Sequence, residues 1–120
     1  MRITFLLLFL KMGGGVKSTL ELANRLQAKG HRVTVAYPVI PGSGGYPLTD
    51  ARKTAHRCLR AGKNLLRKPG VGWFPLQAGL LRVPTLAAKH VPDADIVVAT
   101  WWENAYDVNR YGRDKGEKFY

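Results

Sequence analysis

Residues 3–37 read ITFLLLFLKMGGGVKSTLELANRLQAKGHRVTVAY, and this stretch decides the fold. An apolar run (3–10) leads through three glycines into an amphipathic segment (16–29) that ends at Gly30. A second apolar run (32–37) contains the β-branched residues that strands prefer. The order strand, glycine loop, helix, turn, strand predicts the first βαβ unit of a parallel α/β domain.

The spacing of the apolar residues supports each of these elements. Residues 3–10 are apolar almost without interruption, as in a strand that helices cover on both faces. Within the predicted helix, apolar side chains recur every three to four residues, at Val16, Leu20, Ala23 and Leu26. Because glycine readily adopts the left-handed conformation, Gly30 is suited to end this helix.

The glycine loop is the first candidate site. Gly13, Gly14 and Gly15, followed closely by Lys17, stand where the predicted helix begins. The first backbone N–H groups of a helix have no partner within the helix, so they bind phosphate groups well. We therefore expect these four residues to contact the phosphates of a ligand.

Three alternative roles for this segment stay open. Residues 13–19 (GGGVKST) resemble the phosphate-binding motif GxxxxGK[ST], but Val16 and Lys11 stand where that motif needs glycine. A secretory signal peptide would account for Arg2 and the apolar run, but no A-x-A cleavage site follows. Close packing of strand and helix would also use glycine, although it accounts for one glycine better than for three.

Composition limits the function classes. The 120 residues suffice for one domain with a hydrophobic core, and no apolar run approaches the ~20 residues of a membrane span. Cys58 is the only cysteine, so an internal disulfide is excluded, which is usual for the reducing cytoplasm. The formal net charge of +11 favours anionic partners such as acidic lipids, phosphorylated ligands or nucleic acid.

The positive charge is concentrated in residues 52–68, which contain no acid. If the segment is a helix that begins after Thr49 or Asp50, it has an apolar stripe and a basic stripe, the latter formed by Lys53, Arg57, Arg60, Lys63 and Arg67. Such a helix is suited to an anionic membrane surface. A solvated basic face is the alternative, and nucleic acid is less favoured because no recognised binding motif accompanies the charge.

The remaining sequence predicts further elements of the same sheet. We expect a loop over 38–47, a turn at Trp73 and Phe74, strands over 80–83 and 96–99, a connector over 85–90, a helix over 103–111, a polar turn over 115–118 and a new strand from Phe119. The strand at 96–99 leads into Thr100, Trp101, Trp102 and Glu103. These four residues form the second candidate site, because α/β domains bind ligands at the carboxyl ends of their parallel strands.

The sequence does not indicate a metal site. The segment Asp93-Ala94-Asp95 matches a DxD pattern, but it precedes a strand instead of following one, which favours a role in a turn. His31, His56 and His90 show no metal-ligand spacing with one another or with Cys58. No arrangement typical of nucleophilic catalysis is present either, so we name no catalytic residue.

Two stretches of the chain resemble family 4 glycosyltransferases of the GT-B fold. The first stretch comprises GGGVK (13–17), ELANRL (21–26) and KGHRVTV (29–35). The second, VPDADIVVATWWE (91–103), resembles a rhamnosyltransferase-like subgroup of that family. The resemblance covers most of residues 2–36 and 91–120.

The resemblance implies two Rossmann-like domains that face each other across a cleft. A nucleotide sugar would be the donor substrate and a glycan or lipid-linked molecule the acceptor, in a retaining hexosyl transfer that needs no cofactor and no metal. Many relatives carry a histidine just after the strand that matches residues 96–99, whereas this sequence has Thr100, Trp101, Trp102 and Glu103 there. Trp101 or Trp102 would stack on a sugar and Glu103 would accept hydroxyl hydrogen bonds, with core packing and a helix-start acid as the respective alternatives.

The same resemblance implies that residues 1–120 are a truncated N-terminal, acceptor-side domain. The donor-binding C-terminal domain would be missing, and the chain would be inactive alone. We expect it in the cytoplasm, peripheral to the inner face of the membrane. A basic module that binds membranes or nucleic acid, and a P-loop-like nucleotide-binding protein, are the alternative functions.

Overall fold

Five parallel strands form a sheet within the described part of the chain. The computed structural model describes residues 1–39, 55, 58–59, 62–63, 66 and 70–120. Its strands are β1 (Arg2–Leu6), β2 (Arg32–Pro38), β3 (Gly79–Val83), β4 (Ile96–Ala99) and β5 (Glu117–Phe119). They are ordered β3-β2-β1-β4-β5, and all four neighbouring pairs are parallel. This order, with β1 in the middle, is that of a Rossmann-like sheet and confirms the predicted fold class.

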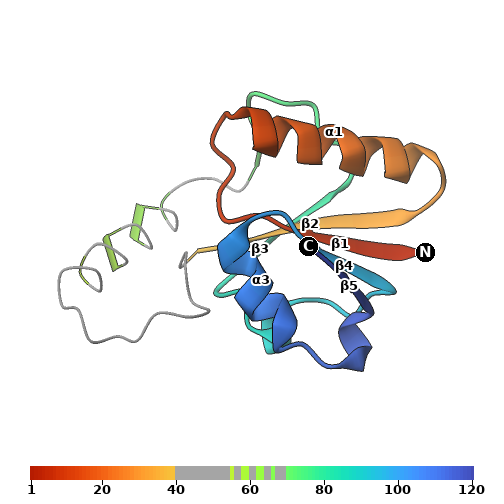
Figure 1. Ribbon diagram of the computed structural model, residues 1–120. Coiled ribbons are helices and arrows are strands. Elements are labelled where there is room, and N and C mark those ends of the chain that lie inside the picture. The colour runs from red at the N-terminus through yellow and green to blue at the C-terminus, as the bar shows by residue number, and fades with distance from the viewer. Residues whose placement is uncertain (40–54, 56–57, 60–61, 64–65, 67–69) are drawn as a thin grey trace.

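Helices cover the two faces of the sheet. Helix α1 (Gly14–Ala28) lies on one face and helix α3 (Trp102–Asn109) on the other (Figure 1). Two short 3₁₀ turns, η1 (Ala88–His90) and η2 (Arg113–Lys115), precede β4 and β5. The three-layer arrangement explains why the apolar strands of the sequence do not alternate with polar residues.

Strand β1, which lies between β2 and β4, contributes to the hydrophobic core on both faces of the sheet. Successive side chains of a strand point to opposite faces. Ile3 and Phe5 therefore pack in the core beneath α1, whereas Leu6 packs in the core on the α3 side. The prediction of a strand covered on both faces is confirmed.

The predicted end of the first strand is wrong. Strand β1 ends at Leu6 and not at Leu10, although the Leu7 N–H still donates to the Ala36 carbonyl oxygen at 2.9 Å. The Leu6 carbonyl oxygen instead accepts side-chain hydrogen bonds from the Thr100 hydroxyl (2.7 Å) and the Asn104 Nδ2 (2.8 Å). Residues 7–13, which follow this point, form a loop that leads to α1.

Helix α1 follows the predicted pattern closely. Val16, Leu20 and Ala23 are buried against the sheet, while Leu22 is 48% exposed. The helix begins at Gly14, two residues earlier than predicted. Gly30 follows it with a φ of 94°, as expected of a glycine that ends a helix.

The C-terminal elements differ from prediction at their ends. The strands predicted over 80–83 and 96–99 are present as β3 and β4. Helix α3 ends at Asn109, two residues before the predicted end, and β5 begins at Glu117, two residues before the predicted start at Phe119. Boundary shifts of this size are ordinary for helices and strands.

Two segments that we predicted to be turns have side chains that pack inside the protein. Trp73 and Phe74 pack edge-to-face with ring centroids 5.9 Å apart, and both contact the core beneath α1. Lys115, expected in a polar turn, is buried, and its Nζ donates to the Val91 carbonyl oxygen and to the Asp93 carboxylate, both at 2.7 Å. These contacts join the turn before β5 to the turn before β4.

None of the helices within the described ranges is both long enough and apolar enough to cross a membrane.

Candidate functional site

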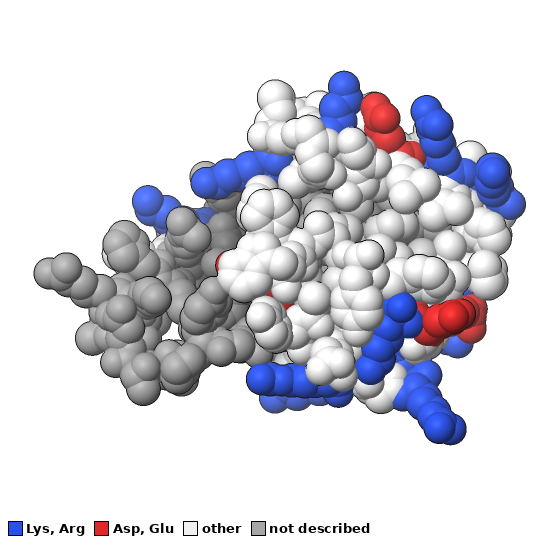
Figure 2. Space-filling model, in the orientation of Figure 1, with Lys and Arg blue, Asp and Glu red and all other residues white. Residues whose placement is uncertain are grey.

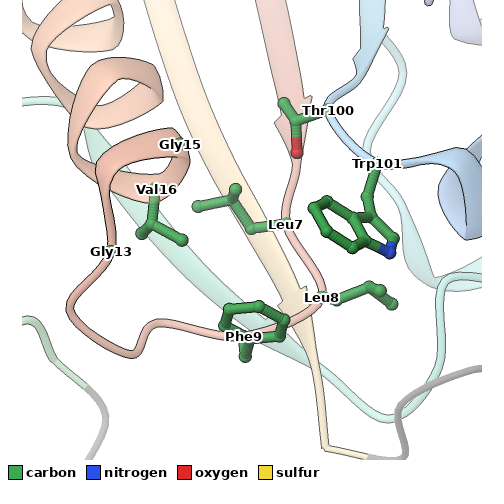
Figure 3. A pocket seen from close by; sticks show the side chains of 8 residues that line it. All are labelled: Leu7, Leu8, Phe9, Gly13, Gly15, Val16, Thr100 and Trp101. Carbon is green, nitrogen blue, oxygen red and sulfur yellow. The ribbon is translucent and has the colours of Figure 1, made fainter.

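A hollow opens at the carboxyl edge of the sheet, where the chain leaves β1 and β4. Its volume is about 280 Å³, and it is lined by Leu7, Leu8, Phe9, Gly13, Gly15, Val16, Thr100 and Trp101 (Figure 3). Strand β1 has β2 on one side and β4 on the other. The chain first adds β2 and β3 on one side of β1, and then returns to add β4 and β5 on the other side. This reversal of strand order is the position at which open α/β sheets bind ligands.

The start of α1 forms one wall of this hollow. Gly13 precedes the helix in an extended conformation (φ −174°), and no side chain in the described ranges caps the helix start. The first turn of α1 also contains no acidic residue. The first backbone N–H groups of the helix are therefore available to an anion, and the helix dipole favours negative charge there.

The three glycines at the start of α1 are not required by the fold. None of them has a positive φ, and a Cβ placed on Gly14 or Gly15 would meet no atom of the described residues within 4 Å. A Cβ on Gly13 would lie 4.0 Å from the nearest atom, the Lys11 carbonyl oxygen. Within the described part of the chain, alanine would fit at each position, which argues against a packing role for these glycines.

The turn after β4 forms the opposite wall. The Thr100 hydroxyl donates to the Leu6 carbonyl oxygen, which fixes this turn to the end of β1. Trp101 is 50% exposed, and Figure 3 shows its ring beside Leu7 and Leu8. The structure thus brings together Gly13, Gly15, Thr100 and Trp101, which belong to the two sites predicted separately from the sequence.

The other predicted residues lie outside this hollow. Gly14 and Lys17 are exposed on the first turns of α1 and do not line it. Trp102 packs edge-to-face with Tyr106, with ring centroids 6.2 Å apart, and borders a smaller hollow of about 180 Å³. Glu103 lies in the first turn of α3, where its negative charge interacts favourably with the helix dipole. Its position therefore fits the alternative role of an acid at a helix start.

The predicted basic stripe falls largely outside the described residues. Lys53, Arg57, Arg60 and Arg67 lie in that part of the chain. Lys63 is described, in helical conformation and exposed.

Asp93 and Asp95 serve to join elements of the fold. The hydrogen bond from Lys115 to Asp93 lowers the pKa of this carboxyl below its usual value. Asp95 accepts a hydrogen bond of 2.7 Å from the Arg2 backbone N–H, which likewise lowers its pKa. The predicted turn role of the DxD segment agrees with these contacts, and the described residues contain no cluster of three His, Cys, Asp or Glu suited to a metal ion.

Sequence reasoning missed several residues that build the hollow. The sequence predicts Leu7, Leu8 and Phe9 in a strand, but these residues form a wall of the hollow. Trp73, assigned to a turn, donates from its indole Nε1 to the Leu10 carbonyl oxygen at 2.9 Å and so holds the loop that follows β1. No local pattern signals this contact, because it joins residues far apart in the sequence.

Asn104 has no structural role predicted from the sequence, although the spacing of residues in α3 indicates one. It lies four residues before Val108 and seven before Tyr111, and all three are buried. This spacing places Asn104 on the buried face of α3. Its Nδ2 donates to the Leu6 carbonyl oxygen, whereas its Oδ1 has no hydrogen-bond partner among the residues that the structure describes.

No protein-family model, curated protein or solved structure matches this chain. The fold and the hollow therefore define its class: a Rossmann-like parallel α/β protein with a ligand-sized hollow between the ends of β1 and β4.

Proposed function

We propose that this chain is the acceptor-side, Rossmann-like domain of a sugar transferase that uses a nucleotide-sugar donor. The observation behind the proposal is the uncapped start of α1, which opens on a hollow between the ends of β1 and β4. Phosphate groups bind at helix starts, and nucleotides bind at this position in Rossmann-like sheets. The sequence resemblance to family 4 glycosyltransferases points to sugar transfer in particular.

In this proposal the start of α1 contacts the donor diphosphate. Gly13 and Gly15 line the hollow, and their lack of side chains lets phosphate oxygens approach the backbone N–H groups. When the bond to the sugar breaks, negative charge develops on the leaving diphosphate. Backbone donors already aimed at that charge stabilise the transition state more than the bound substrate.

Trp101 and the apolar residues after β1 form the surface for the sugar. The half-exposed indole of Trp101 offers an apolar face on which the C–H groups of a sugar ring can stack. The Thr100 oxygen, which donates its proton to the Leu6 carbonyl oxygen, keeps lone pairs that can accept a hydrogen bond from a sugar hydroxyl. Glu103 lies outside the hollow, so the proposal gives it no contact with the sugar.

An NMR titration with UDP-glucose, and with UDP, GDP and dTDP as further probes, tests the proposal. We expect the amide signals of residues 13–16 and the indole signal of Trp101 to shift as the ligand is added. If no probe shifts these signals, the proposal is wrong.

Matched variants sharpen the test. Gly15→Ala adds a methyl group to the wall of the hollow and Trp101→Ala removes the stacking surface, whereas Gly14→Ala and Trp102→Ala change residues that do not line it. We expect the first pair to weaken binding by about tenfold, equivalent to about 1.4 kcal/mol, and the second pair to leave it within about twofold. Equal losses in Trp101→Ala and Trp102→Ala would contradict the assignment of the sugar to this hollow.

A further inference from the structure

A second hollow lies at the opposite edge of the sheet, at the amino ends of β1 and β2. Its volume is about 320 Å³, and it is lined by Arg2, Ile3, Thr4, Arg32, Thr34, Pro92 and Asp93. It shares no lining residue with the hollow between β1 and β4. Nothing in the proposed sugar transfer uses this edge of the sheet.

The register of the sheet places two arginines and two threonines side by side. Arg2 pairs with Arg32, and Thr4 pairs with Thr34, on neighbouring parallel strands. Side chains two residues apart in a strand point to the same face of the sheet. Leu6 follows Arg2 and Thr4 in this series and belongs to the core on the α3 face, so all four side chains point to that face. Neighbouring strands are about 4.8 Å apart, so the paired side chains run beside each other.

This pairing brings together two like charges, which destabilises a sheet unless a counter-charge is present. Arg2 is partly neutralised by Asp95, with 3.5 Å between guanidinium and carboxylate. Arg32 is exposed and forms no ion pair with another described residue. Asp93, the acid that borders the hollow, already accepts a 2.7 Å hydrogen bond from Lys115.

The two threonines add neutral donors next to the guanidinium groups. Thr4 is 2% exposed and Thr34 is half-buried, and neither hydroxyl has a hydrogen-bond partner among the described residues. The residue paired with Thr34 on β3 is Gly79, which has no side chain to cover this part of the sheet. Arg2, Arg32, Thr4 and Thr34 thus all line one hollow, which Asp93 also borders.

We propose that the hollow at the amino ends of β1 and β2 binds a phosphate group. A guanidinium group forms paired, charge-assisted hydrogen bonds with phosphate oxygens. The tetrahedral phosphate also has oxygens left for the Thr4 and Thr34 hydroxyls. The volume of about 320 Å³ exceeds that of a phosphate ion and leaves room for the remainder of a small phosphomonoester.

The test uses inorganic phosphate and β-glycerophosphate as probes, with chloride at matched ionic strength as the reference. We expect the amide signals of Thr4 and Thr34 in NMR spectra to shift with both probes and not with chloride. Tighter binding of β-glycerophosphate assigns the site to phosphomonoesters, and tighter binding of inorganic phosphate assigns it to the free ion. No shift at either threonine would overturn the proposal.

Variants separate this site from general attraction to a basic protein. We expect Arg32→Gln to weaken phosphate binding by about tenfold and Thr34→Val by about threefold, as for the loss of a charged and a neutral hydrogen bond. Arg25→Gln removes one exposed positive charge from α1, on the other face of the sheet, and should leave the affinity within about twofold. Equal weakening in Arg25→Gln and Arg32→Gln would overturn the proposal.

Because the two hollows lie at opposite edges, their tests fail independently. Shifts confined to Thr4 and Thr34 would support the phosphate site while contradicting the proposed donor site. Shifts confined to residues 13–16 and Trp101 would do the reverse.

Discussion

Glycine has opposite roles at Gly116 and at the start of α1. Gly116 has a φ of 84°, and a Cβ on it would overlap the Asp95 backbone and lie 2.6 Å from the Ala94 carbonyl oxygen. Gly14 has ordinary helical geometry, and no atom of the described residues lies within 4 Å of a Cβ placed on it. The fold therefore requires glycine at the first position and does not require it at the second.

Gly116→Ala should destabilise the protein strongly. The added Cβ must displace backbone at the start of β4, and the positive φ is itself unfavourable for alanine, so we expect a loss of about 2–4 kcal/mol. Urea unfolding followed by circular dichroism measures it. Gly112→Ala is the matched control, since its Cβ meets only the flexible carboxylate end of Asp114, and its loss should stay below about 1 kcal/mol.

Gly14→Ala and Gly15→Ala should each stabilise the protein. Both residues lie in the first turn of α1, where alanine is a better helix former, so we expect a gain of about 0.5 kcal/mol for each substitution. The same unfolding measurement tests this expectation. Destabilisation by either change would mean that the fold needs these glycines, and would remove one support for the donor site.

Asn104 and Thr100 connect three elements through a single acceptor. Both donate to the Leu6 carbonyl oxygen, so α3 and the turn after β4 are fixed to the end of β1. The Asn104 side chain is fully buried. Its Nδ2 is therefore the atom whose replacement matters most for this connection.

Asn104→Asp should destabilise the protein at neutral pH. The substitution buries a carboxylate and places an acceptor opposite the Leu6 carbonyl oxygen, for which we expect a loss of about 3 kcal/mol or more. The loss should shrink in acid, where the protonated carboxyl can donate. Unfolding curves at several pH values test this, with Asn109→Asp, an exposed position of α3, as the control that should change little.

Lys115 joins the turn before β5 to the turn before β4, and its pairing with Asp93 depends on pH. The pKa of Asp93 is lowered, chiefly by the hydrogen bond from Lys115, so its contribution is present at neutral pH and is lost as the pH falls below 3.8. The pKa of Lys115 is raised, chiefly by the hydrogen bond to Asp93, so its contribution is present below pH 10.5 and is lost above it.

Lys115→Met should lower stability and flatten this pH dependence. The Val91 carbonyl oxygen loses its donor, and we expect a cost of about 1–3 kcal/mol at neutral pH. Unfolding at about pH 3, 7 and 11 should show a smaller difference between conditions than in the unmodified protein. Lys89→Met, at an exposed position, should leave both stability and its pH dependence unchanged.

For the whole molecule, the sequence predicts those features of the fold that depend on residues close to one another in the chain. Repeating apolar positions mark β1, α1 and β2, and the order of elements places the two candidate sites at the same edge of the sheet. At the end of β1, the Leu6 carbonyl oxygen is bound by Thr100 and Asn104, which lie 94 and 98 residues further along the chain. The hollow with Arg2 and Arg32 depends on strand register, which no local pattern fixes.

The charge of the whole molecule bears on its expected membrane partner. The net charge is +11, and Figure 2 shows Lys and Arg side chains around the rim of one face, with uncharged residues in its centre. A positive charge spread over the surface would attract any anionic membrane weakly. The predicted basic helix over residues 52–68 would instead concentrate the attraction in one segment. The two cases differ in whether charge removed from residues 52–68 weakens membrane binding more than charge removed elsewhere.

Co-sedimentation with vesicles distinguishes the two cases. We expect binding to vesicles that contain phosphatidylserine, little binding to pure phosphatidylcholine, and loss of binding at high salt. Two variants each lower the net charge from +11 to +8 by three changes to glutamine, one at Lys53, Arg57 and Arg60 and the other at the exposed residues Arg25, Lys29 and Lys89. Each Lys or Arg near an anionic membrane contributes about 1 kcal/mol, so the variant at Lys53, Arg57 and Arg60 should weaken binding by about 100-fold. The variant at Arg25, Lys29 and Lys89 should weaken it far less. Equal weakening would assign the attraction to net charge and contradict a membrane-binding helix in residues 52–68.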